Sequence, residues 1–348
     1  MNFLDCFAGI GGFRLGLEKA GHTCIGYIEK DKYARQSYEA IYDAGKEKLI
    51  GEDITKITDE EFRKLRGKVD MLVGGFPCQA FSIAGHKRGF SDTRGTLFFE
   101  LIRATKQIKP QILLFENVKN LLSHDEGKTF ETILYTLDEL GYDVEWQLLN
   151  SKNHGVPQHR ERVFIVGHLR GERGRKVFPI RSSYKQTPNR NEKSTNTITA
   201  RYGEAQSNGS YVIKNKQKKK IDKLTILVKE ATVKGYSEAC LGDSINLEYP
   251  DSKTRRGRVG KKVAQTLTTS CNQGVIISVE DTQVVMPENT KEKYRVRKLT
   301  PKECWRLQGF PDWAFDKARS SGVSDSQLYK QAGNAVTVNV AYEIGLRL

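Results

Sequence analysis

The sequence predicts an α/β fold, in which helices cover both faces of a mostly parallel β-sheet, together with a smaller, mostly β region. Two features of the chain predict it. Short apolar runs alternate with helical patterns from residue 2 to about residue 168, which is typical of a parallel sheet with helical crossovers. Beyond His168 the chain changes to short strand-like pieces among Gly, Asn, Ser and Lys, and helical signals return only at 300–310 and near the C-terminus.

The expected elements follow one another in β-α-β-α order. The apolar runs of strand length are NFLDCF, CIGYIE, VDMLVG, QILLFENV, DVEWQLLN and RVFIVGH. Between these runs we expect helices at about 13–20, 32–42 and 96–107, and a long helix that ends near Leu140. Strands and helices of these lengths form the predicted sheet and its two covering layers.

Length and cysteine usage narrow the class of protein. The 348 residues suffice for one large domain and a smaller one. The six cysteines contain no CxxC pair and the histidines have no paired ligand spacing, so we expect neither a disulfide framework nor a metal site. The chain enters a strand directly and has no apolar run of membrane-spanning length, so we expect a cytoplasmic protein with no membrane partner.

The net charge of +15 is concentrated in one part of the chain. Residues 171–290 carry 22 Lys and Arg against 12 Asp and Glu, which leaves +10 on this stretch. A basic segment beside a nearly balanced body indicates a polyanionic partner, and nucleic acid is favoured. The alternative is a solvated insert, and the run KNKQKKK (Lys214 to Lys220) alone fits that equally well.

A glycine-rich turn, DCFAGIGGF, follows the first strand, where open α/β sheets bind nucleotide-like ligands. The dinucleotide pattern G-x-G-x-x-G fails because its third position is Arg14. Glu29, at the end of the second strand, can accept hydrogen bonds from both ribose hydroxyls, and Asp53 is a further acid near a strand end. A nucleoside without pyrophosphate fits these residues, and S-adenosylmethionine is such a ligand.

A lone cysteine stands on a proline-stiffened turn directly after the strand VDMLV. Cys78 has no second cysteine nearby, and reactive cysteines lie on exposed turns whereas structural ones are buried within elements. Two other strands also end in polar residues. Glu116 and Asn117 close QILLFENV, although Asn117 can also be the N-cap of a helix. Gln158, Arg160 and Arg162 alternate into the last strand and can hold an anionic or carbonyl-rich ligand, although this pattern is also typical of a solvated edge.

Together these stretches resemble the DNA (cytosine-5) methyltransferases of bacterial or phage restriction-modification type, along the whole chain. The matching blocks, in the family's order, are DCFAGIGGF, GFPCQAFS, RGTLFFE, ENV, the QxRxR of QHRER, RKLTPKECWRLQGFP and QAGNAV. The resemblance implies a Rossmann-like S-adenosylmethionine-dependent methyltransferase fold with a smaller, mostly β target-recognition domain. Residues 1–172 and 325–348 would form the catalytic domain, and residues 173–324 the target-recognition domain and hinge.

The resemblance also implies the reaction, which is methyl transfer from S-adenosyl-L-methionine to C5 of cytosine in a specific duplex DNA sequence. A thiolate that adds to C6 breaks the aromaticity of the ring and makes C5 nucleophilic, which is the role expected of Cys78. Glu116 would hydrogen-bond cytosine N3, and Arg160 and Arg162 would hold O2 and the nucleotide. Because the base is buried in the duplex, it must swing out of the stack.

Cofactor residues follow from the same resemblance. The turn would contribute Phe7, Gly9, Gly11 and Gly12, Glu29 would bind the ribose and Asp53 the adenine amine. The remaining pocket residues would be Ile54, Pro77, Leu97, Asn334 and Val336. Lys30 departs from the family, in which an apolar or aromatic residue that stacks on adenine often follows the acid.

DNA contacts are expected from two regions. The segment from Gln79 to about Thr96 resembles the loop that closes over the flipped base, with Gln79 or Ser82 filling the gap and with Lys87, Arg88 and Arg94 along it. In the basic region a weak echo joins 196–213 and 265–276. We favour the second copy for base reading, with Thr266, Thr268, Asn272 and Gln273, and place Arg201 and Tyr202 second. The lysine run would attract phosphates.

Two alternatives to this function use the same sequence blocks. One is a tRNA cytosine-5 methyltransferase, which the large basic insert disfavours. The other is a catalytically silent DNA-binding protein, which has no use for the set Cys78, Glu116, Arg160 and Arg162. The expected partner is double-stranded DNA, and the expected state is a monomer. A cognate restriction endonuclease that acts on the same site is a further candidate partner, and the recognition sequence itself cannot be deduced.

Overall fold

The computed structural model describes residues 1–43, 49–77, 97–171, 176–181, 226–249, 252–254, 256–278 and 294–348. The chain forms two compact units. The first comprises Met1–Tyr184, Thr268–Ser270 and Pro301–Leu348, and the second comprises Lys185–Leu267 and Cys271–Thr300.

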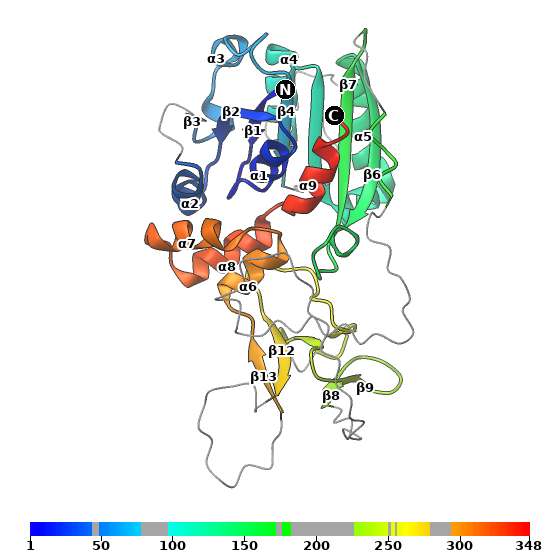
Figure 1. The fold of residues 1–348 in the computed structure, drawn as a ribbon. Coiled ribbons are helices and arrows are strands. Elements are labelled where there is room, and N and C mark those ends of the chain that lie inside the picture. Colours follow the sequence, from blue (N-terminus) through cyan, green and yellow to red (C-terminus); the bar gives the residue numbers. More distant parts are fainter. Residues whose placement is uncertain are drawn as a thin grey trace. The chain divides into compact units, whose positions relative to one another are not determined.

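Within the described residues, a seven-stranded sheet forms the centre of the first unit (Figure 1). Its strands run in the order β3-β2-β1-β4-β5-β7-β6. Strand β7 is antiparallel to both of its neighbours, and the other pairs are parallel, so the sheet is mostly parallel, as expected. The bounds are β1 (Asn2–Cys6), β2 (Thr23–Ile28), β3 (Leu49–Gly51), β4 (Met71–Gly75), β5 (Ile112–Val118), β6 (Tyr142–Asn150) and β7 (Glu161–Leu169).

The strand order fixes where a ligand can bind. From β1 the chain moves outward to β2 and β3, then returns to place β4 on the other side of β1. This reversal is a topological switch point, and in open α/β sheets ligands bind in the crevice at the carboxyl ends of the strands that flank it. The turns after β1, β2, β4 and β5 therefore meet at one edge of the sheet.

Helices cover both faces of this sheet because successive side chains of each strand point to opposite sides. Phe3 of β1 shares a hydrophobic cluster with Leu17 of α1 and Ile344 of α9, whereas its neighbour Leu4 belongs to a second cluster with Leu101 of α4. Figure 1 shows α1 and α9 side by side on the first face. The bounds are α1 (Gly12–Lys19), α2 (Lys32–Tyr42), α3 (Asp59–Arg63), α4 (Leu97–Ile108), α5 (Lys128–Glu139), α6 (Pro301–Leu307), α7 (Asp312–Ser320), α8 (Asp325–Asn334) and α9 (Val338–Gly345).

The expected helix that ends near Leu140 is confirmed as α5, although it does not begin directly after β5. The chain after β5 forms two short 3-10 turns, and α5 begins only at Lys128. Asp125 and Glu126 adopt left-handed backbone conformations at φ 50° and 56°, which no α-helix accommodates. Helix α3 was not expected at all, although its capping box between Thr58 and Glu61 is visible in the sequence.

The C-terminal helices belong to the first unit as a group. Residues 301–324, which the sequence reading placed with the recognition domain and hinge, fall in the first unit together with α8 and α9. Their packing explains this, because the indole N–H of Trp305 in α6 donates to the Leu328 carbonyl of α8 at 3.0 Å and Trp305 itself is fully buried. None of the helices in the described ranges is long and apolar enough to cross a membrane.

The described residues of the second unit form antiparallel strands. Strand β8 (Ile226–Lys229) pairs with β9 (Tyr236–Ala239). A second sheet has the order β11-β10-β12-β13, with β10 (Ser244–Asn246), β11 (Val259–Gly260), β12 (Gln273–Ser278) and β13 (Tyr294–Lys298). Of the two segments linked by the sequence echo, 196–213 lies outside the described residues, and 265–276 leads into β12.

Candidate active site

The turn between β1 and α1 is built on left-handed residues. Phe7, Gly9 and Gly11 have φ values of 56°, 55° and 79°. Gly12 is required for a different reason, since a Cβ there would lie 2.2 Å from the carbonyl oxygen of Val336. The turn and the segment of Val336 therefore touch through backbone atoms, so two blocks that lie more than 300 residues apart in the chain form one side of the site.

A half-buried carboxylate follows β2 and holds this turn. The amide N–H of Gly9 donates to Glu29 Oε2 and that of Asp31 donates to Glu29 Oε1, both at 2.7 Å. Burial raises the pKa of Glu29, while the two amide donors lower it. Because each carboxylate oxygen can accept a second hydrogen bond, Glu29 stays able to receive hydroxyl donors beside the glycine turn.

Lys30 pairs with Asp53, the residue expected to bind an adenine amine. The Lys30 Nζ lies 2.8 Å from Asp53 Oδ2, and Thr55 donates to Oδ1 through its amide at 3.1 Å and its hydroxyl at 2.8 Å. The hydrogen bonds from Lys30 and Thr55 lower the pKa of Asp53 to about 2. The residue that departs from the family pattern is thus an ion-pair partner at the end of β2.

The ends of β4 and β5 are tied together by Asn117. Its Nδ2 donates to the Phe76 carbonyl at 2.8 Å, and its Oδ1 accepts the amide N–H of Val118 at 2.8 Å. The alternative role of Asn117 as a helix N-cap is wrong, because Val118 occupies the N-cap position of the 3-10 turn that follows. Asn117 instead fixes the backbone at Phe76. The exposed Pro77 follows Phe76, and the predicted nucleophile Cys78 comes next in the chain.

Glu116 and Arg162 form an ion pair at this edge. Arg162 Nε lies 3.0 Å from Glu116 Oε1, and both side chains are largely buried. A Cβ on Gly75 would lie 3.1 Å from Glu116 Oε2, so the glycine at the end of β4 leaves room for the carboxyl group. Burial raises the pKa of Glu116, while the guanidinium groups of Arg162 and Arg160 lower it. The result is a carboxyl group that holds a proton more readily than an exposed one.

Arg160 and Gln158 point into the protein and not to a solvated edge. Arg160 is buried, and its Nη2 donates to the Ala335 carbonyl at 2.9 Å. Gln158 is fully buried, and its Nε2 donates to the Leu307 carbonyl at 2.8 Å. The polar residues that lead into β7 therefore connect this strand to the end of α6 and to the segment directly after α8.

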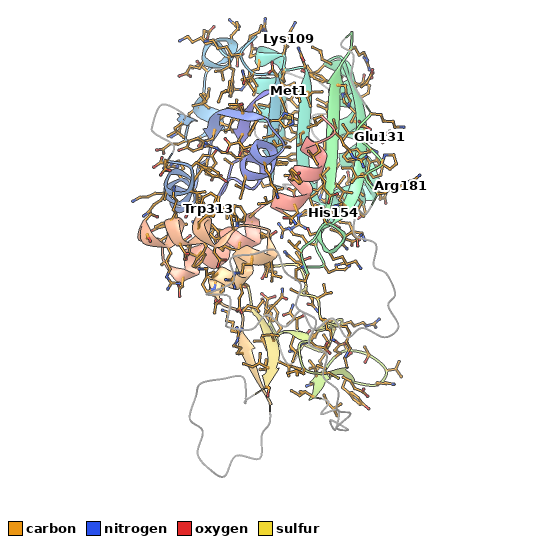
Figure 2. The ribbon with its side chains drawn as sticks, viewed as in Figure 1. Met1, Lys109, Glu131, His154, Arg181 and Trp313 are labelled. Atoms are coloured by element: carbon orange, nitrogen blue, oxygen red, sulfur yellow. The ribbon has the colours of Figure 1, made fainter. Side chains whose placement is uncertain are left out.

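Sequence reasoning missed a buried polar network around the C-terminal segment. Gln308 is fully buried, donates through Nε2 to the Ala332 carbonyl at 2.7 Å and accepts the Thr337 hydroxyl at 2.9 Å. The Thr337 and Ser151 hydroxyls lie 2.9 Å apart. Figure 2 shows His154 near α9, where its Nδ1 lies 2.9 Å from Glu343 Oε2. The available signal was a glutamine between Leu307 and the Gly309–Phe310 pair, directly after the helix.

The other predicted site residues differ in exposure, and several lie outside the described ranges. Phe7, Leu97 and Val336 are half-buried, Ile54 is buried, and Asn334 at the end of α8 is exposed. Eight predicted residues lie outside the described residues: Cys78, Gln79, Ser82, Lys87, Arg88, Arg94, Arg201 and Tyr202. Among the residues that are described, His, Cys, Asp and Glu form no group of three or more that could hold a metal ion.

In the second unit, the Gln273 side chain hydrogen-bonds the backbone of the preceding segment. It is buried, its Nε2 donates to the carbonyls of Gln265 and Thr266 at 2.9 and 3.2 Å, and its Oε1 accepts the Gln265 amide at 3.0 Å. Asn272 is half-buried, and its carbonyl accepts the Leu247 amide at 2.9 Å. Thr266 is half-buried, whereas Thr268, which belongs to the first unit, is exposed.

The strand order and the glycine turn after β1 define a Rossmann-like α/β protein. Solved structures share this fold. The Dnmt2 methyltransferase of S. pombe superposes with a TM-score of 0.62 at 19% identity, over 100% of this chain and 98% of that one. A putative DNA modification methyltransferase encoded within an E. coli prophage gives 0.59 at 21% identity, over 99% and 97%. These likenesses show that the chain shares the fold of these two proteins.

The family follows from the sequence. The model of the C-5 cytosine-specific DNA methylases matches residues 1–348, so the chain belongs to this family and is a DNA cytosine-5 methyltransferase. The type II methyltransferase M.HhaI of Haemophilus parahaemolyticus is 33% identical, over 100% of this chain and 95% of that protein. The type II methyltransferase M.SsoII of Shigella sonnei is 36% identical over 99% and 79%, and the orphan methyltransferase M.SPRI of Bacillus phage SPR is 31% identical over 99% and 96%.

Proposed function

We propose that this protein transfers a methyl group from S-adenosyl-L-methionine to C5 of a cytosine within a specific duplex DNA sequence, through covalent addition of Cys78 to C6 of a flipped base. The observation that carries the proposal is the Glu116–Arg162 pair at the ends of β5 and β7. It lies against Gly75 of β4, the strand that leads through Phe76 and Pro77 to Cys78. Family membership supplies the context.

The residues around the glycine turn fit the adenosine part of this cofactor. Gly9 has open space where a Cβ would point, and Glu29 lies next to it with acceptor capacity for two ribose hydroxyls. Asp53, held ionised by Lys30 and Thr55, can accept the adenine amine beside the ribose. The bound cofactor would supply an electrophilic methyl group, and the product S-adenosyl-L-homocysteine would leave from the same residues.

The chain's own residues supply the activation of cytosine. The Cys78 thiolate adds to C6, and the electron pair of the C5–C6 double bond moves to C5, which takes the methyl group. Loss of the C5 proton and expulsion of the thiolate then restore the ring. We propose that Glu116 favours the addition by donating a hydrogen bond to cytosine N3, a role for which a raised pKa is suited because the carboxyl group must hold a proton.

We propose different roles for the two arginines of the QxRxR block, Arg160 and Arg162. Arg162 pairs with Glu116, so we propose that it holds the nucleotide of the flipped base. Arg160 is buried against Ala335, and this contact supports a role in placing the C-terminal segment. Contact of Arg160 with cytosine O2 stays a prediction.

The partner follows from the charge and from the family. The basic stretch 171–290 supports attraction to phosphates, and enzymes that act on a base in duplex DNA must rotate it out of the stack. Family membership favours DNA over tRNA as the substrate. A gel-shift comparison of duplex DNA with tRNA separates these two, and sedimentation tests the expected monomer. Bisulfite sequencing of plasmid DNA from a host that expresses the protein identifies the site that a cognate endonuclease would share.

Covalent trapping tests the mechanism. DNA with 5-fluorocytosine at the target should form a denaturant-resistant complex with the wild-type protein, because fluorine cannot leave as a proton and the thiolate is not expelled. Cys78→Ser should still bind DNA, but it should form no covalent complex and transfer no methyl group, since a hydroxyl is a far weaker nucleophile than a thiol near neutral pH. Failure to trap under conditions in which ordinary DNA is methylated would contradict the proposed mechanism.

A further inference from the structure

Tyr42, the last residue of α2, lies directly against the glycine turn. Its hydroxyl donates to the Gly11 carbonyl at 2.6 Å, and the Ile10 carbonyl lies 3.4 Å away. A Cβ on Gly11 would stand 2.4 Å from the Tyr42 ring, so the ring takes the space that this glycine leaves open. Neither the family motifs nor the sequence pattern indicates Tyr42 as part of the site.

Contacts with Arg14 and Tyr38 set the orientation of the Tyr42 ring. The guanidinium carbon of Arg14 lies 4.2 Å from the ring centroid, within the range of a cation–π contact. Arg14 is itself buried and is held by Glu18 through a 2.9 Å ion pair along α1. Tyr38, one turn earlier in α2, packs on Tyr42 with 4.7 Å between ring centroids. The hydroxyl is therefore carried by a ring with contacts on several sides.

The helix that carries Tyr42 is anchored independently of the turn. The hydroxyl of Ser37 in α2 donates to Gln331 Oε1 in α8 at 3.0 Å, and Gln331 Nε2 donates to the Tyr33 carbonyl at 2.9 Å. The Gly11 carbonyl also accepts the amide N–H of Leu15 at 2.9 Å, which is the first hydrogen bond of α1. Helix α1 thus keeps its first bond without Tyr42, and the hydroxyl adds a lateral constraint on the turn.

We propose that Tyr42 is a positioning residue for the cofactor, which fixes the carbonyl side of the Ile10–Gly11 turn while Glu29 fixes its amide side at Gly9. The proposal rests on the proposed function, because it assumes that this turn binds S-adenosylmethionine. With both sides of the turn held, its remaining backbone donors keep one geometry before the cofactor arrives, and the ordering cost on binding is small.

Removal of the single hydroxyl tests this role. Tyr42→Phe keeps the ring and its contact with Arg14, and we expect about 3- to 10-fold weaker binding of S-adenosylhomocysteine, the effect of one net hydrogen bond. The KM for S-adenosylmethionine should rise by the same factor, and kcat at saturating cofactor should stay unchanged. Calorimetry with S-adenosylhomocysteine and initial rates on duplex DNA measure these quantities.

Tyr27→Phe is the matched control. Tyr27 belongs to the same aromatic cluster, stacks on Tyr38 with 4.1 Å between centroids and donates its hydroxyl to Glu39 at 3.0 Å, away from the turn. Tyr27→Phe should lower the melting temperature about as much as Tyr42→Phe does, and it should keep the wild-type affinity for S-adenosylhomocysteine. Equal affinities for wild type, Tyr42→Phe and Tyr27→Phe would overturn the proposal alone, as would a fall in kcat without a change in affinity. A wild-type protein that binds no S-adenosylhomocysteine would contradict the proposed function as well.

Discussion

Asp5 carries a carboxyl group that the fold buries near the carboxyl end of β1. Neither of its carboxylate oxygens has a hydrogen-bond partner among the described residues. The pKa of Asp5 is raised to about 8, mainly by burial and to a smaller extent by Glu29 and Glu18, against the lowering effect of the Arg14 guanidinium. The carboxyl group is therefore protonated in the folded protein at neutral pH, whereas in the unfolded chain it ionises near its ordinary value of 3.8.

This difference predicts a pH-dependent stability. Between the two pKa values the folded state holds a proton that the unfolded state lacks, so stability falls as pH rises, by up to about 1.4 kcal/mol per pH unit, and levels off above the folded pKa. Asp5→Asn removes the proton exchange and should flatten this part of the curve. Urea unfolding of both proteins from about pH 5 to about pH 9 measures the difference. Parallel curves would contradict the buried, protonated state of Asp5.

At the scale of elements, one side-chain hydrogen bond connects the ends of β4 and β5. Asn117 is buried at the end of β5 and holds the carbonyl of Phe76, two residues before Cys78. In Asn117→Ala this carbonyl loses its donor, at a cost of about 1 to 3 kcal/mol if water does not replace it. We expect a slower methyl-transfer step, because the segment that carries the nucleophile loses its anchor, and an unchanged affinity for the cofactor.

Single-turnover methylation and the rate of 5-fluorocytosine trapping both measure this step. Asn120→Ala, an exposed asparagine on the following turn, serves as the control and should behave as wild type. Equal trapping rates for Asn117→Ala and Asn120→Ala would show that the Phe76 contact does not position Cys78.

For the whole molecule, the division of labour between the two units can be tested by exchange. Replacement of residues 171–296 with the matching segment of a relative should transfer the relative's target sequence, while cytosine remains the methylated base. Within this segment, Gln273 holds the backbone of Gln265 and Thr266, so the geometry of the loop belongs to the segment itself. Bisulfite sequencing of DNA methylated by the chimera gives the result. An active chimera that keeps the original target would place sequence reading elsewhere.

Much of the fold could be predicted because local patterns determine it. The strands β1, β4, β5 and β7 are apolar runs, and burial on both faces of a parallel sheet requires such runs whatever the rest of the chain does. The break before α5 could not be predicted from apolar spacing, since left-handed conformations at Asp125 and Glu126 give no apolar signal. Glu29 was recognisable because its position relative to Gly9 is a local consequence of one β-α-β unit.

The amino-acid sequence by itself determined the family, the residue types at the strand ends and the location of the basic region. Only the tertiary structure decided which partner each of these polar groups has. Gln158, Arg160 and Arg162 share one alternating pattern, yet Gln158 donates to the Leu307 carbonyl, Arg160 donates to the Ala335 carbonyl and Arg162 pairs with Glu116. The reason is physical: a polar side chain bonds whatever lies opposite it, and those partners come from the far end of the chain, which no local pattern contains.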